Sequence, residues 1–108
     1  MKLNYKLSEC ASTSPWLILI HGLFGNADNL AGIKRHFESN YNVISIDLPD
    51  HGESPWTSSF SVDDAANAVF DIMQSLNIRE CAVLGHSLGG KVAMRLALNH
   101  GYVVSHLI

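Results

Sequence analysis

VLGHSLGGKVA, residues 83–93, is the stretch that decides how the rest of the sequence is interpreted. Residues 85–89, GHSLG, fit G-x-S-x-G, the tight turn that presents a serine nucleophile. Residues 85–91, GHSLGGK, also fit G-x-x-x-x-G-K, the beginning of a phosphate-binding loop. Both motifs require a strand before them and a helix after them. The neighbouring residues must therefore show whether the serine motif or the phosphate-binding loop is present.

The residue after Lys91 argues against the phosphate-binding loop. That loop needs Ser or Thr at this position because the hydroxyl holds a magnesium ion, and Val92 has no hydroxyl. The serine motif fits better, since Gly85 and Gly89 remove side chains that would crowd a sharp turn. Ser87 is therefore the candidate nucleophile, and a glycine-rich turn without chemistry is the alternative.

The rest of the chain alternates between strand patterns and helix patterns. Continuous or alternating apolar runs predict strands, and apolar residues three and four apart predict helices. Ser61, followed three residues later by Asp64, is a capping signal for one of these helices. The predicted strands are 2–7, 16–20, 41–46, 80–84 and 102–108, and the predicted helices are 28–37, 62–76 and one that begins at 88. This order predicts an α/β fold with a mostly parallel sheet, helices on both of its faces, and ligands at the carboxyl ends of the strands.

Composition limits the classes of protein that fit. The 108 residues suffice for one domain, and 47% hydrophobic residues exclude a disordered chain. Seven Lys and Arg against ten Asp and Glu leave no basic stripe, so nucleic acid is not an expected partner. The longest early apolar run, 16–20, is too short for a signal sequence or a membrane span. This predicts a cytoplasmic protein that does not bind a membrane. The six histidines lack the spacing of metal ligands, so a metal site is not expected.

A second motif, HGLFG at residues 21–25, follows the strand predicted for 16–20. Acyl transfer needs two main-chain N–H groups aimed at the oxyanion that develops in the transition state. The residue after the nucleophile, Leu88, supplies one donor, and Leu23 in this loop is the candidate for the other. Phe24 either lines an acyl pocket or packs beneath the loop.

Three segments carry a family resemblance: HGLFGNADNL at 21–30, DLPDHGESPW at 47–56 and VLGHSLGGKVAMRLAL at 83–98. In this order and spacing they resemble the α/β-hydrolase superfamily, and within it the small bacterial serine carboxylesterases. The resemblance implies a nucleophile at Ser87 and oxyanion donors at Leu23 and Leu88. It also implies hydrolysis of carboxylic esters or of thioesters such as acyl-CoA through an acyl-enzyme, without a cofactor.

Such hydrolases carry their triad in the chain order Ser, then Asp or Glu, then His. No Asp or Glu follows Ser87 here. His100 lies roughly 20 Å away along the predicted helix, and His106 lies inside the last predicted strand. We therefore expect residues 1–108 to be the N-terminal part of a hydrolase domain, inactive alone, whose acid and His lie in later polypeptide. A non-catalytic remnant or binding fragment is the alternative.

The remaining polar residues are expected to act structurally. His21, His51 and His86 should bond loop backbone, with the His86 side chain turned away from the site. Asp47 and Ser54 should hold their own loop. The last predicted strand, 102–108, leaves an open apolar sheet edge, which predicts self-association.

Overall fold

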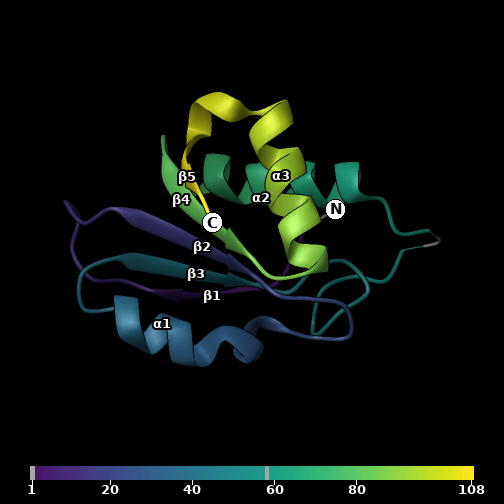
Figure 1. The fold of residues 1–108 in the computed structure, drawn as a ribbon, viewed down its shortest axis with the longest axis horizontal. Coiled ribbons are helices and arrows are strands. Elements are labelled where there is room, and N and C mark those ends of the chain that lie inside the picture. Colours follow the sequence, from purple (N-terminus) through teal and green to yellow (C-terminus); the bar gives the residue numbers. More distant parts are fainter. Residues whose placement is uncertain (1, 58) are drawn as a thin grey trace.

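A computed structural model describes residues 2–57 and 59–108, and these residues form an α/β fold (Figure 1). Its sheet has the strand order β1-β3-β2-β4-β5. β1 runs antiparallel to β3, and the other neighbours are parallel, which confirms the mostly parallel sheet. The strands are β1 (Tyr5–Ser8), β2 (Trp16–Ile20), β3 (Asn42–Ile46), β4 (Cys81–Gly85) and β5 (Val104–Leu107).

The helices cover both faces of this sheet, as expected. α1 lies on one face, and α2 and α3 lie together on the other (Figure 1). The helices are α1 (Ala31–Phe37), α2 (Val62–Ser75) and α3 (Leu88–Asn99), with 3-10 turns η1 (Ala27–Leu30) and η2 (Gly101–Val103). The Ser61 hydroxyl accepts the N–H of Asp64 at 3.2 Å, so the expected cap begins α2.

Two clusters of apolar side chains fill the space on either side of the sheet. Leu17, Leu19 and Val43 point toward α1, whereas Ile18 and Ile44 point toward α2 and α3. Successive side chains of a strand point to opposite faces, so a strand covered on both faces needs an apolar residue at every position. The uninterrupted apolar run of β2 is explained by this double burial, and β3 is buried at every position although it includes Asn42 and Ser45.

The structure corrects several predicted element boundaries. The helix predicted for 28–37 is a 3-10 turn over Ala27–Leu30 followed by α1. The Asn26 side chain accepts the N–H of Asp28, and the Asn29 side chain accepts the N–H of Asn26, which tightens the first turn. The last strand begins only at Val104, because the preceding three residues form η2.

The first strand was also predicted too early, at residue 2 instead of Tyr5. Asn4 donates its main-chain N–H to the Ser54 hydroxyl at 2.8 Å, and its carbonyl accepts the N–H of Asp47. These bonds attach the segment before β1 to the loop that follows β3. The loop is thereby held at the carboxyl end of the sheet, where the site lies.

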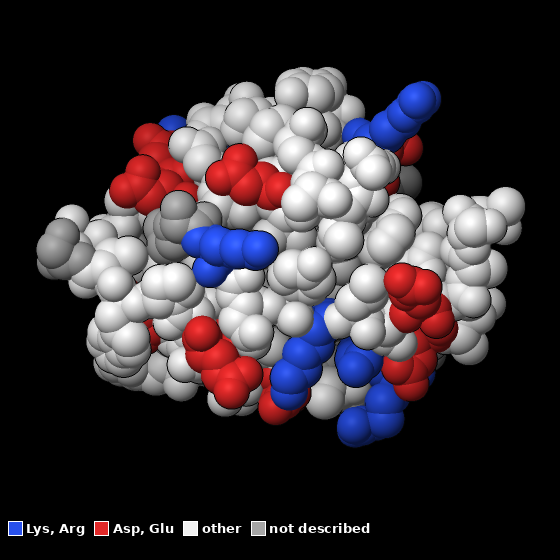
Figure 2. Space-filling view, turned by 180° about the vertical axis from the view of Figure 1, so that it is seen from behind, with Lys and Arg blue, Asp and Glu red and all other residues white. Residues whose placement is uncertain are grey.

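Two surface features bear on possible partners. Among the helices in the described part of the chain, none combines the length and the apolar composition needed to traverse a bilayer. On the face shown in Figure 2, Lys and Arg side chains lie between Asp and Glu side chains and do not gather into one basic surface.

Candidate active site

Ser87 occupies the sharp turn between β4 and α3, in a backbone conformation that few residues other than glycine adopt. Its φ is 57° and its ψ is −116°. Such a conformation costs on the order of 1–3 kcal/mol and persists only where the surroundings impose it. His86 N–H donates to the Ile20 carbonyl at 3.0 Å, and Lys91 N–H donates to the Ser87 carbonyl at 3.2 Å. The turn is thus attached to the sheet on one side and to α3 on the other.

The Ser87 side chain is exposed and does not cap α3. Within residues 2–57 and 59–108 the hydroxyl has no hydrogen-bond partner. A serine at a helix N-terminus would ordinarily accept an N–H of the first turn. Here the backbone conformation turns the hydroxyl away from that role and leaves it available to a ligand.

Gly85 and Gly89 let α3 approach the sheet closely at this turn. A Cβ added at Gly89 would overlap the main-chain oxygens of Ile20 and His21. A Cβ added at Gly85 would overlap the carbonyl group of Gly89. Both obstacles are backbone atoms, which cannot rotate aside. The two glycines of the motif are therefore required by the packing that positions Ser87.

The loop at residues 22–25 lies directly beside Ser87. A Cβ added at Gly22 would be 3.3 Å from the Cβ of Ser87. Gly22, Leu23, His86 and Ser87 line the same surface hollow. In the described part of the chain, the main-chain N–H groups of Leu23 and Leu88 have no acceptor. The structure thus brings the predicted nucleophile and the loop of one predicted donor together, with both N–H groups free.

The prediction that the His86 side chain points away from the site is wrong. A Cβ added at Gly22 would lie 3.1 Å from His86 Nδ1, so the ring is turned toward the 22–25 loop. The ring is exposed and, among the described residues, has no hydrogen-bond partner. The tight turn directs the ring toward Gly22, which has no side chain to exclude it.

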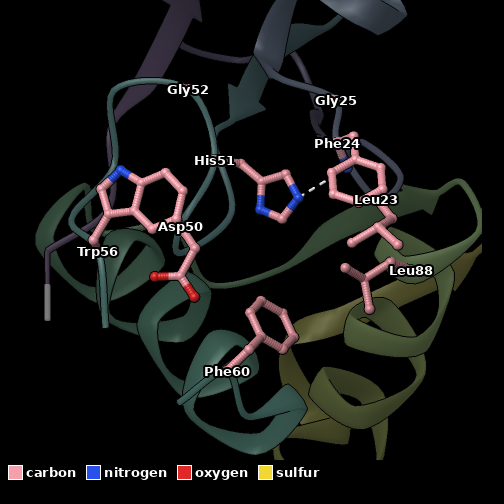
Figure 3. A pocket seen from close by; sticks show the side chains of 9 residues that line it. All are labelled: Leu23, Phe24, Gly25, Asp50, His51, Gly52, Trp56, Phe60 and Leu88. Carbon is pink, nitrogen blue, oxygen red and sulfur yellow. Dashed lines mark hydrogen bonds between the residues drawn. The ribbon is translucent and has the colours of Figure 1, made fainter. Parts of the chain in front are cut away.

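A larger cavity of about 520 Å³ opens next to this hollow (Figure 3). Leu23, Phe24 and Leu88 lie on one side of it and Trp56 on the other. Phe24 is 92% exposed and therefore does not pack beneath its loop, which was one of the two expectations for it. Phe60 and the loop residues near position 50 complete the wall. The cavity is mostly apolar and suits an apolar group of a small molecule.

A family model for the alpha/beta hydrolase fold matches residues 15–108. The chain belongs to this family. It forms an N-terminal portion of the α/β-hydrolase fold, with the mostly parallel sheet described above.

Individual relatives agree with this assignment. A Haemophilus influenzae protein, provisionally named as an esterase/lipase, is 38% identical over 108 residues, which cover 98% of this chain and 38% of that protein. The sn-1-specific diacylglycerol lipase ABHD11 of Mus musculus is 31% identical over 110 residues, covering 100% of this chain and 36% of that protein. The structure of a marine microorganism esterase superposes with a TM-score of 0.88 at 30% identity, covering 95% of this chain and 39% of that one. The chain spans less than two fifths of the length of each.

In this α/β hydrolase, His21 joins the loop after β2 to the loop after β3. Leu48 N–H donates to His21 Nε2 at 3.0 Å, so the proton of the neutral ring is on Nδ1, which donates to the Gly22 carbonyl at 2.7 Å. Burial lowers the pKa of His21 below its ordinary value, which keeps the ring neutral. The expectation that His21 bonds loop backbone is confirmed.

Asp47 connects the same region from the end of β3. Its carboxylate accepts the N–H of Ala27 at 2.7 Å, the N–H of Glu53 at 3.0 Å and the Asn4 amide at 2.8 Å. The Ser54 hydroxyl donates to the Asp47 carbonyl at 2.5 Å, as expected for a residue pair that holds its own loop. Burial alone would raise the pKa of Asp47, but the hydrogen bonds from Glu53, Asn4 and Ala27 outweigh it and hold the pKa below its ordinary value.

Acid is expected to destabilise the chain through both groups. The pKa of His21 is lower in the folded state than in the unfolded state, so the unfolded state takes up a proton first as the pH falls. The contribution of His21 to the free energy of unfolding is therefore complete above about pH 6.5 and is lost as the pH falls from there. The contribution of Asp47 is complete above about pH 4 and is lost below it. Urea unfolding between about pH 7.5 and pH 3 measures both.

The substitution Asp47→Asn separates the contribution of Asp47 to acid stability from that of His21. The variant should be less stable by about 1–3 kcal/mol at neutral pH, because an amide –NH₂ would face main-chain donors. This deficit should shrink in acid, where Asp47 is itself protonated. Asp71→Asn, on the exposed side of α2, is the matched control and should follow the original curve. A deficit that stays constant at every pH contradicts this assignment.

The two histidines that follow Ser87 lie away from the hollow. His100 stacks on Phe70, with ring centroids 3.8 Å apart, at the far end of α3. His106 is exposed on β5. In residues 2–57 and 59–108, no group of three or more His, Cys, Asp or Glu side chains is arranged to hold a metal ion.

Proposed function

We propose that this chain belongs to a serine hydrolase that cleaves carboxylic esters through an acyl-enzyme formed on Ser87. The backbone conformation of Ser87 carries this proposal. Its φ of 57° presents an exposed hydroxyl at the N-terminus of α3, and this hydroxyl has no hydrogen-bond partner among the described residues. A group held in a strained turn beside a cavity is a candidate nucleophile on physical grounds. The names of the relatives, esterase and lipase, support the same reaction class.

In this proposal Leu23 and Leu88 donate their main-chain N–H groups to the oxyanion. Both groups lie next to Ser87 in sequence or in space, and neither has an acceptor among the described residues. Leu88 is also the first residue of α3, where the helix dipole favours negative charge. Two preorganised donors would stabilise the tetrahedral intermediate without reorganisation.

The general base belongs, in this proposal, to polypeptide outside residues 1–108. His100 and His106 lie away from Ser87, and a serine hydroxyl without a base is a poor nucleophile. Residues 1–108 expressed alone should therefore turn over esters at a negligible rate. The non-catalytic alternative differs in one respect, because it predicts no turnover by the full-length gene product either.

The test is hydrolysis of a short-chain p-nitrophenyl ester by the full-length gene product. We expect turnover, and the matching thioester shows whether acyl-CoA-like substrates are also accepted. Residues 1–108 alone, shown by circular dichroism to be folded, should give no measurable rate. Absence of both activities from the folded full-length gene product would favour the non-catalytic alternative.

Phe24 is the candidate substrate contact in the apolar cavity. Phe24→Ala should lower kcat/KM for esters with an apolar acyl chain by about 5- to 30-fold, mainly through KM, since a lost apolar contact is worth about 1–2 kcal/mol. The fold should be unaffected, because the side chain is 92% exposed. Leu98→Ala removes an exposed apolar side chain on α3 that does not line the cavity, and should leave KM unchanged. An equal effect of both substitutions, or none for Phe24→Ala, would exclude Phe24 from the substrate site.

Two further expectations stay predictions. The cytoplasmic location rests on the sequence alone. Self-association through the sheet edge formed by β5, where Leu107 and Ile108 are exposed, would appear as dimers or larger species of residues 1–108 in sedimentation.

A further inference from the structure

His51 contacts the loop at residues 22–25 from the loop that follows β3. Its Nε2 accepts the main-chain N–H of Phe24 at 2.9 Å, drawn as a dashed line in Figure 3. Its Nδ1 lies 2.9 Å from the Pro49 carbonyl. Because Nε2 is an acceptor, the proton of the neutral ring is on Nδ1 and is donated to Pro49. The ring thus joins the two loops only in its neutral form and in one tautomer.

The bond from Phe24 stabilises an unusual turn. Gly25 N–H donates to the Gly22 carbonyl at 3.0 Å, and Phe24, the third residue of the turn, has a φ of 63°. These are the features of a type II turn, in which glycine is normally required at the third position. A phenylalanine would favour the type I form, in which the peptide group between Leu23 and Phe24 is rotated to the opposite orientation. The Phe24 N–H would then no longer point at His51.

The ring of His51 is itself held in place. It packs against the His21 ring at a centroid distance of 5.2 Å and against Phe60 at 6.5 Å. A fixed acceptor can select one turn form over another, whereas a mobile side chain would follow the turn. His51 is therefore placed to determine the conformation of the 22–25 loop.

We propose that His51 is a positioning residue for the oxyanion loop: by accepting the Phe24 N–H it anchors the residue next to Leu23 and so fixes the loop that carries the Leu23 N–H beside Ser87. His51 does not touch the reacting atoms in this account and acts through the Phe24 N–H. The inference rests on the proposed function, because it assigns Leu23 as an oxyanion donor. Misplacing one donor by about an ångström is expected to lower kcat about 10- to 100-fold.

Two amide substitutions separate the two hydrogen bonds of the ring. The Gln side chain can place its oxygen near the position of Nε2, whereas the shorter Asn reaches only the position of Nδ1. In the full-length gene product, His51→Asn should therefore lower kcat about 10- to 100-fold with little change in KM. His51→Gln should recover most of that loss. His36→Asn, on the exposed side of α1, controls for loss of a histidine and should keep the original rate.

A spectroscopic measurement tests the hydrogen bond itself, independently of activity. In the isotope-labelled full-length gene product, NMR should detect scalar coupling between the Phe24 amide nitrogen and His51 Nε2. Absence of that coupling, or a proton on Nε2, would overturn the inference even if His51→Asn fails to fold. Equal rates for folded His51→Asn and His51→Gln would also overturn it. Failure of the proposed function is distinguishable, because it would appear as no ester hydrolysis at all or as hydrolysis that persists in Ser87→Ala, whereas the coupling reports the hydrogen bond in either case.

Discussion

Ser87→Ala should lower kcat for ester hydrolysis by the full-length gene product on the order of 10⁵- to 10⁶-fold. In the proposed mechanism this hydroxyl forms the covalent bond to the acyl group, and no other side chain in the described part of the chain stands in the same hollow with a free hydroxyl. The fold should be retained, because the side chain is exposed and alanine keeps a Cβ at the same backbone conformation. Initial rates with a p-nitrophenyl ester and a thermal melt measure both effects.

Ser12→Ala is the matched control for this substitution. Ser12 is exposed in the connection before β2, on a segment that lines neither the hollow nor the cavity. It should retain the original rate. If folded Ser87→Ala keeps more than about a tenth of the original rate, Ser87 does not carry the covalent step.

Gly89→Ala should destabilise the protein by about 3 kcal/mol or more and abolish activity with it. The added methyl group would overlap the main-chain oxygens of Ile20 and His21, so α3 would have to move away from β2. That movement would carry Ser87 with it. Urea unfolding of residues 1–108 measures the loss, since the glycine packs inside this part of the fold.

Gly90→Ala, one residue further along α3, is a close control. Its added Cβ would lie 3.4 Å from the nearest atom, the Gly85 carbonyl oxygen, which is ordinary contact. Alanine favours a helix by up to about 1 kcal/mol over glycine, so this variant should be as stable as the original or more so. Equal stabilities of the Gly89 and Gly90 variants would contradict the close packing of α3 on β2.

The parts of the fold that could be predicted are those that depend on a short, continuous stretch of sequence. Trp16–Ile20 is an uninterrupted apolar run, and a strand buried on both faces needs one. Ser87 between Gly85 and Gly89 is a local signature whose cause, close backbone packing, appears directly in the structure. The cap at Ser61 is local in the same way.

The parts that were not predictable depend on contacts between distant loops. The residues near Phe24 in the sequence do not identify His51, which lies in a loop after another strand, as the acceptor of the Phe24 N–H. The three segments joined by Asp47, which contain Asn4, Ala27 and the loop after β3, are likewise assembled only by the fold. One signal was available for the first of these, since a non-glycine residue in HGLFG at a turn requires some compensating contact. The orientation of His86 was mispredicted because it depends on the space left by Gly22 across the site.

The central claim is that the Ser87 hydroxyl is an activated nucleophile, and a fluorophosphonate probe tests it most directly. The full-length gene product is treated with the probe, digested, and mapped by mass spectrometry. We predict one phosphonate adduct, on the peptide that contains Ser87, and its loss in Ser87→Ala. An ester-hydrolysing protein that carries the adduct on a different residue, or that stays unlabelled, would contradict the claim.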